Sequence, residues 1–401
     1  MLDDFGQRIR DIILSEMDLS RELSDEEICD LIGSVVSREA RDRPMTIKDR
    51  AELERTIFNS LRKLDVLQEL VDDRDVTEIM VNGPNDIFYE KAGRIQRFKG
   101  HFSSEEKLED VIQQIVGRHN RVVNQASPIV DTRLSDGSRV NIVLNPISIG
   151  GSAVSIRKFP EHPMSMERLV EIEALSPEVA RLLQILTQAK YNIFISGGTG
   201  SGKTTFLNAL SQYIPDDERI ITIEDSAELQ LLGAKNIVRL ETRNANTDGV
   251  TPITIRDLIR TALRMRPDRI IVGECRGAEA LDMLQAMNTG HDGSLSTGHA
   301  NSPHDIISRI ETMVLQGQDF PLNAIRQQIA SGIDIIVQLG RLRDKSRRVL
   351  EVSEVDGFMD GEIVLHTLYR FEETAVLDSG RIQRRCWVHR CVSRCTRHWD
   401  G

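Results

Sequence analysis

The sequence predicts an α/β protein organised around a parallel sheet, preceded by an α+β sheet domain and a helical module. Three observations support this prediction. Apolar residues recur at three- and four-residue steps over residues 1–70, with charged residues between them. Short β-branched and aromatic runs separated by turn residues follow over 71–160. Strand-like apolar runs then alternate with helical patterns over 176–345, as in a parallel sheet covered by helices.

The first 160 residues contain both helix-like and strand-like patterns. Ile9, Ile12 and Ile13 open a series of amphipathic segments that we expect to form a helical module up to residue 70. A further helix is expected from about 105 to 118, and the Asp136-Gly137 pair predicts a hairpin. The strand candidates are VTEIMVNG, IFYEKAG, RIQRF, SPIVDTRL, SRVNIVL and AVSIRKF. We expect them to form a mainly antiparallel sheet.

A linker leads from this domain into the α/β domain. The prolines of FPEHPMSMERL mark residues 161–175 as the linker. The strand candidates of 176–345 are NIFIS, RIITIE, NIVRLE, RIIVGE and DIIVQL, whose almost continuous apolar character suits burial on both faces. Residues 346–380 hold further strand-like pieces and form a C-terminal extension. Residues 381–401 form an atypical basic tail with cysteines, which we expect to be poorly ordered.

Composition restricts the class of protein. Of the 401 residues, 40% are hydrophobic and 28% charged, as in soluble globular proteins. The formal net charge is 51 − 62 = −11, so nucleic acid is not an expected partner, because it binds to concentrated Lys and Arg. No run approaches the ~18 apolar residues that cross a bilayer, and the acidic N-terminus lacks a signal-peptide pattern. We therefore expect a cytoplasmic protein with only peripheral membrane association. Five cysteines without a disulfide spacing fit a reducing compartment.

The most specific motif is GGTGSGKT, which matches G-x-x-x-x-G-K-[ST] between a strand candidate and a helix-forming run. Its glycines allow backbone N–H groups to converge on phosphate oxygens, and the positive end of the following helix adds to that field. Lys203 supplies a cation for the β- and γ-phosphates, and the Thr204 hydroxyl a ligand for Mg²⁺. A dinucleotide fingerprint is disfavoured because it needs Gly or Ala at position 203. The predicted nucleotide-binding residues are Gly197, Gly198, Thr199, Gly200, Ser201, Gly202, Lys203, Thr204 and Thr205.

Two strand candidates end in carboxylates. RIITIE leads to Glu224-Asp225, and RIIVGE ends in Gly273-Glu274. Parallel strands place their carboxyl ends at the sheet edge where ligands bind, so these acids can polarise water or support a Mg²⁺ shell. Gly273 stands where the usual Walker B motif has an aspartate. The alternative for each acid is a helix cap or a surface ion pair.

Two histidines, His291 and His299, lie among small residues in TGHDGSLSTGHA. Neither a H-E-x-x-H pattern nor a matching cysteine spacing indicates zinc. A histidine near a γ-phosphate can donate a hydrogen bond to it and relay its loss to neighbouring elements. A histidine on a loop can equally be a polar surface group. The residues alone leave both alternatives open.

Together these motifs resemble the secretion ATPase superfamily. They are GGTGSGKTT, ITIEDSAELQL, RMRPDRIIVGECRGAEALDMLQAMNTGHDGSLSTGHANSP and, upstream, VTEIMVNGP, SPIVDTRLSDGSRVNIV and SIRKF. They look most like CpaF-type ATPases of tight-adherence (Flp) pilus systems, over about residues 70–345. The resemblance implies a homo-hexamer with a RecA-like P-loop motor and a PAS-like N-terminal sheet domain over the nucleotide. It also implies ATP as substrate, Mg²⁺ as cofactor, and inner-membrane platform proteins as partners.

The resemblance implies roles for single residues. The catalytic residues that the resemblance implies are Glu274 of the atypical Walker B motif, Glu224 and Asp225 of the Asp box, and His291 and His299 of the His box. Arg139 and Arg157 match arginines that reach the phosphates from the N-terminal domain, a task that suits the planar, always-charged guanidinium. Without the resemblance, a solvated strand face is the preferred interpretation of both arginines.

Two further patterns concern charge. Arg256, Arg260 and Arg264 recur every four residues, which suits an ion-paired, exposed helix face or a contact with a neighbouring subunit. The tail RIQRRCWVHRCVSRCTRHWDG departs from the family pattern. Its cysteines and His398 fit no standard zinc spacing, so an altered terminus is the preferred interpretation.

The expected function is a hexameric motor that hydrolyses ATP to power assembly of a tight-adherence pilus or a related machine. Two alternatives stay open. One is a traffic ATPase for type IV secretion of protein or DNA, which shares the motor and differs in cargo. The other is a nucleotide-gated scaffold with little turnover.

Overall fold

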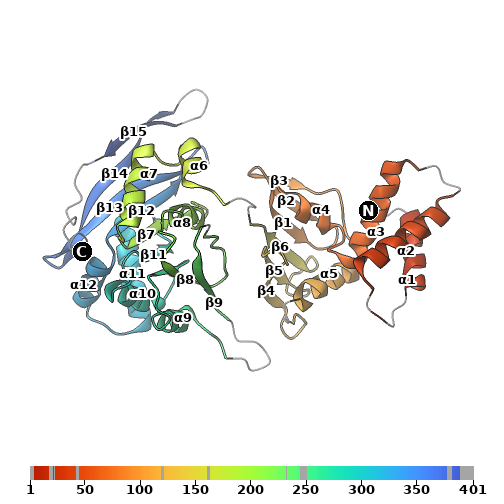
Figure 1. The fold of residues 1–401 in the computed structure, drawn as a ribbon, viewed down its shortest axis with the longest axis horizontal. Coiled ribbons are helices and arrows are strands. Elements are labelled where there is room, and N and C mark those ends of the chain that lie inside the picture. The colour runs from red at the N-terminus through yellow and green to blue at the C-terminus, as the bar shows by residue number, and fades with distance from the viewer. Residues whose placement is uncertain are drawn as a thin grey trace. The chain divides into compact units, whose positions relative to one another are not determined.

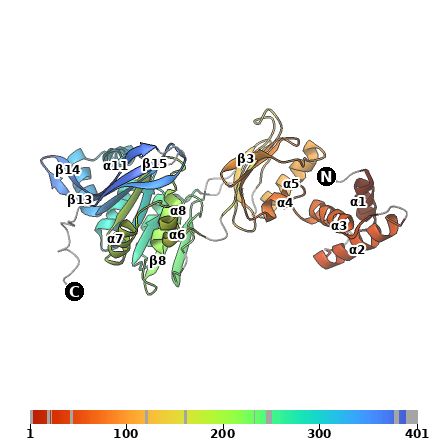
Figure 2. The same ribbon diagram turned by 90° about the horizontal axis from the view of Figure 1, so that it is seen from above.

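The computed structural model describes residues 4–17, 21, 23–41, 45–118, 122–159, 163–231, 233–243, 251–376 and 382–388. The chain divides into two compact units, with the boundary between residues 161 and 162. Figures 1 and 2 show the helices and strands of both units. Each unit has its own hydrophobic cores. Within the described residues, no helix is both long and apolar enough to cross a membrane.

The first unit begins with three packed helices. These are α1 (Asp4–Glu16), α2 (Asp25–Glu39) and α3 (Ile47–Arg62). Ser24 and Thr46 start α2 and α3 with capping boxes, in which the hydroxyl accepts the N3 amide and the N3 carboxylate accepts the amide of the cap. Ile9, Ile28 and Ile57, one from each helix, are fully buried in their shared core. The helices predicted for this part of the chain are confirmed.

A six-stranded sheet forms the rest of the first unit. Its strands are β1 (Val76–Asn82), β2 (Ile87–Lys91), β3 (Arg94–Arg97), β4 (Ile129–Arg133), β5 (Arg139–Val143) and β6 (Ala153–Arg157), in the order β3-β2-β1-β6-β5-β4. Its neighbouring strands are antiparallel, as predicted. Apolar residues of α4 (Leu67–Asp72) and α5 (Glu105–Gly117) pack against the sheet. The hairpin predicted at Asp136-Gly137 joins β4 to β5.

The second unit is built on a sheet whose described strands number nine. They are β7 (Ile193–Gly197), β8 (Arg219–Glu224), β9 (Asn236–Glu241), β10 (Arg269–Val272), β11 (Leu295–Gly298), β12 (Ile335–Arg341), β13 (Arg347–Met359), β14 (Glu362–Val376) and β15 (Ile382–Val388). The order is β15-β14-β13-β12-β7-β11-β10-β8-β9, parallel from β12 to β9 and antiparallel from β12 to β15.

Helices cover both faces of this second sheet (Figure 1). One core contains residues of α6 (Met166–Glu171), α7 (Pro177–Gln188) and α8 (Lys203–Ser211). The other contains residues of α9 (Ile255–Ala262), α10 (Glu279–Asn288), α11 (Pro303–Gly317) and α12 (Leu322–Gly332). Because both faces are covered, β7 and β10 are buried along their whole length, which explains their continuous apolar sequences.

The predicted fold class is confirmed, and the five strand candidates of the α/β region correspond to β7, β8, β9, β10 and β12. Strand β11 was missed, because LSTG lacks a β-branched apolar run. It nevertheless lies between β7 and β10 in the middle of the sheet. Strand β11 therefore positions the segment that follows it, which begins with His299.

The tail requires a correction. Residues 382–388, which we expected to be poorly ordered, form β15 and pair with β14. The physical reason is that the edge of β14 offers unpaired N–H and C=O groups on which another strand can form. Residues 381 and 389–401, including Cys391, Cys395 and His398, lie outside the described residues, so the question of a zinc site there stays open.

Candidate nucleotide site

The phosphate loop lies at the carboxyl edge of the second sheet. It connects the end of β7 at Gly197 to the start of α8 at Lys203. Gly200 and Gly202 have φ angles of 70° and 93°, which glycine adopts without strain. No side chain caps α8, so its first amides stay available, and the buried hydroxyl of Ser201 has no hydrogen-bond partner among the described residues. A helix N-terminus with unused donors suits an anion such as a triphosphate.

Lys203 is only 8% exposed, although it is charged. Its Nζ donates to the backbone oxygens of Gly197 at 3.1 Å and Gly198 at 3.2 Å. Burial lowers the pKa of Lys203, while the nearby carboxylate of Glu274 opposes that shift. The ammonium of Lys203 therefore contacts the backbone of the phosphate loop. Phosphate oxygens can replace these carbonyl oxygens as its acceptors.

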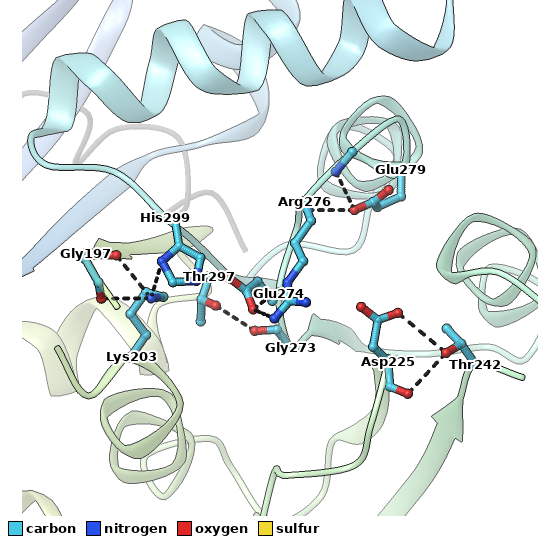
Figure 3. A network of polar contacts seen from close by, with 12 residues as sticks. Gly197, Lys203, Asp225, Thr242, Gly273, Glu274, Arg276, Glu279, Thr297 and His299 are labelled. Carbon is cyan, nitrogen blue, oxygen red and sulfur yellow. Dashed lines mark hydrogen bonds and ion pairs between the residues drawn. The ribbon is translucent and has the colours of Figure 1, made fainter. Parts of the chain in front are cut away.

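Glu274 follows β10 and projects to the same edge (Figure 3). Its Oε2 accepts hydrogen bonds from Arg276, at 2.6 Å from Nη2 and 2.9 Å from Nε. Its Oε1 lies 2.7 Å from Nε2 of His299, within ion-pair distance. This Oε1 is buried and receives no well-aligned hydrogen bond from the described residues. One carboxylate oxygen is thus held, and the other remains available as an acceptor.

His299 follows β11 and lies between Lys203 and Glu274 (Figure 3). Its Nδ1 is 3.2 Å from Nζ of Lys203. Burial, and then the charge of Lys203, lower the pKa of His299, against the opposing effect of Glu274. The lowered pKa favours the neutral imidazole near pH 7, and the short Nδ1–Nζ distance suits Nδ1 as the acceptor from Lys203. The ring nitrogen Nε2 then lies near Oε1 of Glu274 without the alignment of a hydrogen bond.

Glu224 explains why the Walker B position is a glycine. Glu224 is 4% exposed, and its Oε1 accepts the backbone N–H groups of Glu228 at 2.8 Å and Leu229 at 2.9 Å. A Cβ atom on Gly273 would lie 2.8 Å from Cγ of Glu224, closer than carbon atoms approach. The carboxylate from the neighbouring strand occupies the space in which a Walker B aspartate would begin.

Asp225 differs from its buried neighbour because it is exposed at the site edge. The hydroxyl of Thr242 donates to its backbone oxygen at 3.1 Å and, more weakly, to Oδ1 at 3.5 Å. Figure 3 shows Asp225 with Arg276 and Glu274 at this edge. The two Asp-box acids thus have different surroundings, which the sequence did not distinguish.

The structure does not bring His291 to this edge. His291 precedes β11, whereas His299 follows it, so the strand separates them by its full length. The ring Nδ1 of His291 lies 3.3 Å from the backbone oxygen of Ala286. Within one chain, only His299 of the two histidines contacts Lys203 and Glu274.

The predicted phosphate-binding arginines lie on neighbouring strands of the first unit. Arg139 of β5 is in register with Arg157 of β6, and also with Arg133 of β4. Arg133 was not among the residues predicted from the sequence, although the hairpin register around Asp136-Gly137 pairs it with Arg139. The role of Arg139 and Arg157 at the phosphates stays a prediction.

Two of the three arginines that recur every four residues form ion pairs within the second unit. Nε of Arg256 is 2.7 Å and Nε of Arg260 is 3.0 Å from the carboxylate of Asp282 on α10, which is 4% exposed. Arg264 lies beyond the end of α9. The ion-paired interpretation is confirmed for the first two arginines, and their partner lies within the same unit.

A cavity of about 300 Å³ adjoins Ser201, Gly202 and Thr205 of the loop. Arg347 closes one side of it, where its Nε donates to the backbone oxygen of Gly200 at 2.9 Å. Sequence analysis missed the cavity because its lining comes from separate segments of the chain. The apolar lining includes Met164, Leu169, Ile172, Phe206, Leu339 and Val349. Its size is at the lower end of ligand pockets, which suits part of a ligand such as a base.

The side chains at the site suit Mg²⁺ only when a substrate phosphate supplies further ligands. Among the described residues, no group of three or more His, Cys, Asp and Glu side chains could hold a metal ion. Mg²⁺ commonly keeps several waters and binds through substrate phosphates with few protein ligands. Thr204, in the first turn of α8 beside Lys203, is the side chain placed for that role.

Comparison with known proteins identifies the family of this chain. The model of the family described as Type II/IV secretion system protein matches residues 60–397. A putative conjugal transfer protein of Mycobacterium tuberculosis is 32% identical over 322 residues, covering 78% of this chain and 91% of that protein. The type IV secretion system protein PtlH of Bordetella pertussis is 33% identical over 320 residues, covering 73% and 94%. The pilus retraction motor PilT with bound ADP shares the fold, at a TM-score of 0.55 and 23% identity over 77% of this chain and 82% of that one. This chain belongs to the type II/IV secretion system ATPase family.

Proposed function

We propose that this chain is a motor subunit that hydrolyses Mg-ATP to drive a pilus or secretion machine. One observation carries the proposal: the segments that follow three parallel strands place His299 in contact with both Lys203 and Glu274, beside a loop that suits an anion. A lysine for phosphate and a carboxylate for water are groups that phosphoryl transfer to water uses. A histidine between them can hydrogen-bond the γ-phosphate. Membership of the family supports the same activity.

Binding is assigned to the phosphate loop. The amides of residues 198–203 and the ammonium of Lys203 hold the β- and γ-phosphates, and the Thr204 hydroxyl holds Mg²⁺. When bound, Mg²⁺ neutralises charge on the β- and γ-phosphate oxygens. The base and ribose occupy the cavity beside Thr205.

The reaction is in-line attack of water on the γ-phosphorus. The new bond forms to the water oxygen, the bond to the β–γ bridging oxygen breaks, and ADP and phosphate leave. Glu274 accepts a hydrogen bond from the attacking water through Oε1 and so orients it. Lys203 neutralises charge that develops on the phosphates, and the family resemblance assigns Arg139 and Arg157 the same task.

Two variants test this assignment. Lys203→Ala should abolish binding of fluorescent ATP, because the loop loses its buried cation. Glu274→Ala should still bind ATP but release scarcely any phosphate. Near-normal phosphate release by Glu274→Ala would refute the role of this carboxylate.

The two histidines supply a matched pair of variants. His299→Ala should slow hydrolysis, because it removes the group between Lys203 and Glu274. His291→Ala should slow hydrolysis much less, since His291 lies at the other end of β11. Equal slowing of phosphate release in both variants would contradict the placement of the site at one sheet edge.

For the cargo, we propose a tight-adherence (Flp) pilus, on the strength of the resemblance to CpaF-type ATPases. We propose that the chain works as a cytoplasmic homo-hexamer that touches inner-membrane platform proteins and is only peripheral to the membrane. The names of the two sequence relatives favour a second candidate, a type IV secretion traffic ATPase for protein or DNA. Adjoining genes for pilin, prepilin peptidase and two platform proteins would support the pilus, and co-purification with a conjugation channel would refute it. Absence of phosphate release from hexamers, with platform proteins present, would instead indicate a nucleotide-gated scaffold.

A further inference from the structure

We propose that Arg276 is a positioning residue for the hydrolysis assigned above: it holds Oε2 of Glu274 so that Oε1 faces the attacking water. Neither the motif pattern nor the resemblance assigned a role to Arg276. The inference rests on the proposed function, because it names a residue that makes Glu274 effective. It depends on the backbone around Glu274, the bonding of the carboxylate and the charges at the site.

The backbone on both sides of Glu274 is pinned. The amide of Cys275 donates to the backbone oxygen of Thr297 on β11 at 2.8 Å, and the Cys275 side chain is 1% exposed. The amides of Arg276 and Gly277 both donate to Oε1 of Glu279, at 2.7 and 2.8 Å. The segment between β10 and α10 is therefore fixed before any ligand arrives, which is what a precisely aimed side chain requires.

The carboxylate of Glu274 is held asymmetrically. Arg276 directs two N–H groups to Oε2, whereas Oε1 is buried and receives no aligned donor from the described residues. Oε1 is the oxygen that lies 2.7 Å from Nε2 of His299. Figure 3 shows His299 and Lys203 on one side of Glu274 and Arg276 on the other. A carboxylate without Arg276 could rotate about its last bond and exchange its two oxygens.

Charge points to the same role. An anionic carboxylate beside a triphosphate is repelled by it, and a fixed cation behind the carboxylate offsets that repulsion. The pKa of Arg276 is raised by its hydrogen bond to Glu274 and further by the charges of Glu274, Asp225 and Glu228. The guanidinium stays charged, so it can support Glu274 through a whole catalytic cycle.

An exposed ion pair can also be energetically unimportant, and the Arg276 side chain is 62% exposed. Activity measurements on the full-length hexamer separate the two roles. Arg276→Ala should lower kcat about ten- to a hundredfold, because a charged hydrogen-bond partner of the reacting carboxylate is lost. KM and the affinity for fluorescent ATP should stay within about twofold of wild type. Added guanidinium ion should restore part of the rate, and Arg276→Lys should retain more activity than Arg276→Ala.

Arg309→Ala is the matched control. Arg309 is an exposed arginine of α11 whose charge also acts on Lys203 and His299, but no described contact joins it to Glu274. It should lower kcat much less than Arg276→Ala does. In a Glu274→Gln background, Arg276→Ala should have no further effect, because the group through which Arg276 acts is already changed.

Four results would overturn the proposal. Three are an unchanged kcat in Arg276→Ala, an equal loss of kcat in Arg309→Ala, and a further loss of kcat in the Glu274→Gln background. The fourth is a loss of ATP affinity equal to the loss of kcat, because that would indicate a binding role. If Arg276→Ala does not fold, Arg276→Lys measured in both the wild-type and the Glu274→Gln background decides. A wild-type hexamer that releases no phosphate would refute the proposed function itself. This failure is distinguishable from failure of the Arg276 proposal, because it is seen in the wild-type protein without any variant.

Discussion

The contact between Gly273 and Glu224 allows a stability prediction that does not depend on any ligand. In Gly273→Ala the new Cβ would lie 2.8 Å from Cγ and 3.3 Å from Oε1 of Glu224. Glu224 cannot move aside freely, because its Oε1 accepts two backbone N–H groups. Overpacking of this kind costs roughly 1–3 kcal/mol. Loss of one charge-assisted hydrogen bond adds about 1.5–3 kcal/mol.

We therefore expect Gly273→Ala to lower the free energy of unfolding of the second unit by about 2.5–6 kcal/mol. For a unit of this size, that corresponds to a fall in Tm of roughly 5–24 °C. Hydrogen–deuterium exchange in urea, read from peptides of residues 163–231 and 251–373, measures it selectively for the second unit. Gly198→Ala, in the same unit, is the control, because nothing lies within 4 Å of its Cβ. It should be neutral or slightly stabilising.

A double-mutant cycle identifies the cause. Glu224→Ala alone should destabilise the second unit, because the amides of Glu228 and Leu229 lose their acceptor. Adding Gly273→Ala to that variant should cost little, because the clashing Cγ is gone. The reasoning is refuted if Gly273→Ala costs less than about 0.5 kcal/mol, or if it costs the same in both backgrounds.

Two further predictions concern the cavity and the histidine. Ile172 is a half-exposed residue that lines the cavity, and Ile172→Trp should weaken ATP binding at least about tenfold. Binding of tripolyphosphate, which has no base, should stay unchanged. Equal losses of affinity for both ligands in calorimetry would place the base elsewhere. Because the folded state lowers the pKa of His299, its stabilising contribution is complete above pH 6.5 and is lost as pH falls through the lowered value. The Tm advantage of wild type over His299→Gln should therefore shrink on acidification from about pH 7.5 to 5, and a constant advantage would contradict the assignment. The charges that act on His299 are those of Lys203, Glu274, Arg276 and Arg309.

The sequence by itself determined the features that depend on neighbouring residues. The loop from Gly197 to Thr204 is contiguous, and its glycines, lysine and threonine each have a local physical role. Strands buried on both faces require continuous apolar runs, so β7, β8 and β10 could be predicted. The carboxylates at their ends could therefore be placed at one edge of a parallel sheet.

Only the tertiary structure decided which of these groups meet. Strand β11 has no strong local signal and is specified by its neighbours β7 and β10, so sequence could not show that His299 reaches the site while His291 does not. The glycine at 273 has its reason in Glu224, about fifty residues away along the chain. The hold of Arg276 on Glu274, and the cavity beside the loop, likewise arise from rotamers and packing between separate segments. Side-chain contacts between distant segments depend on how the whole chain packs, and no local pattern encodes them.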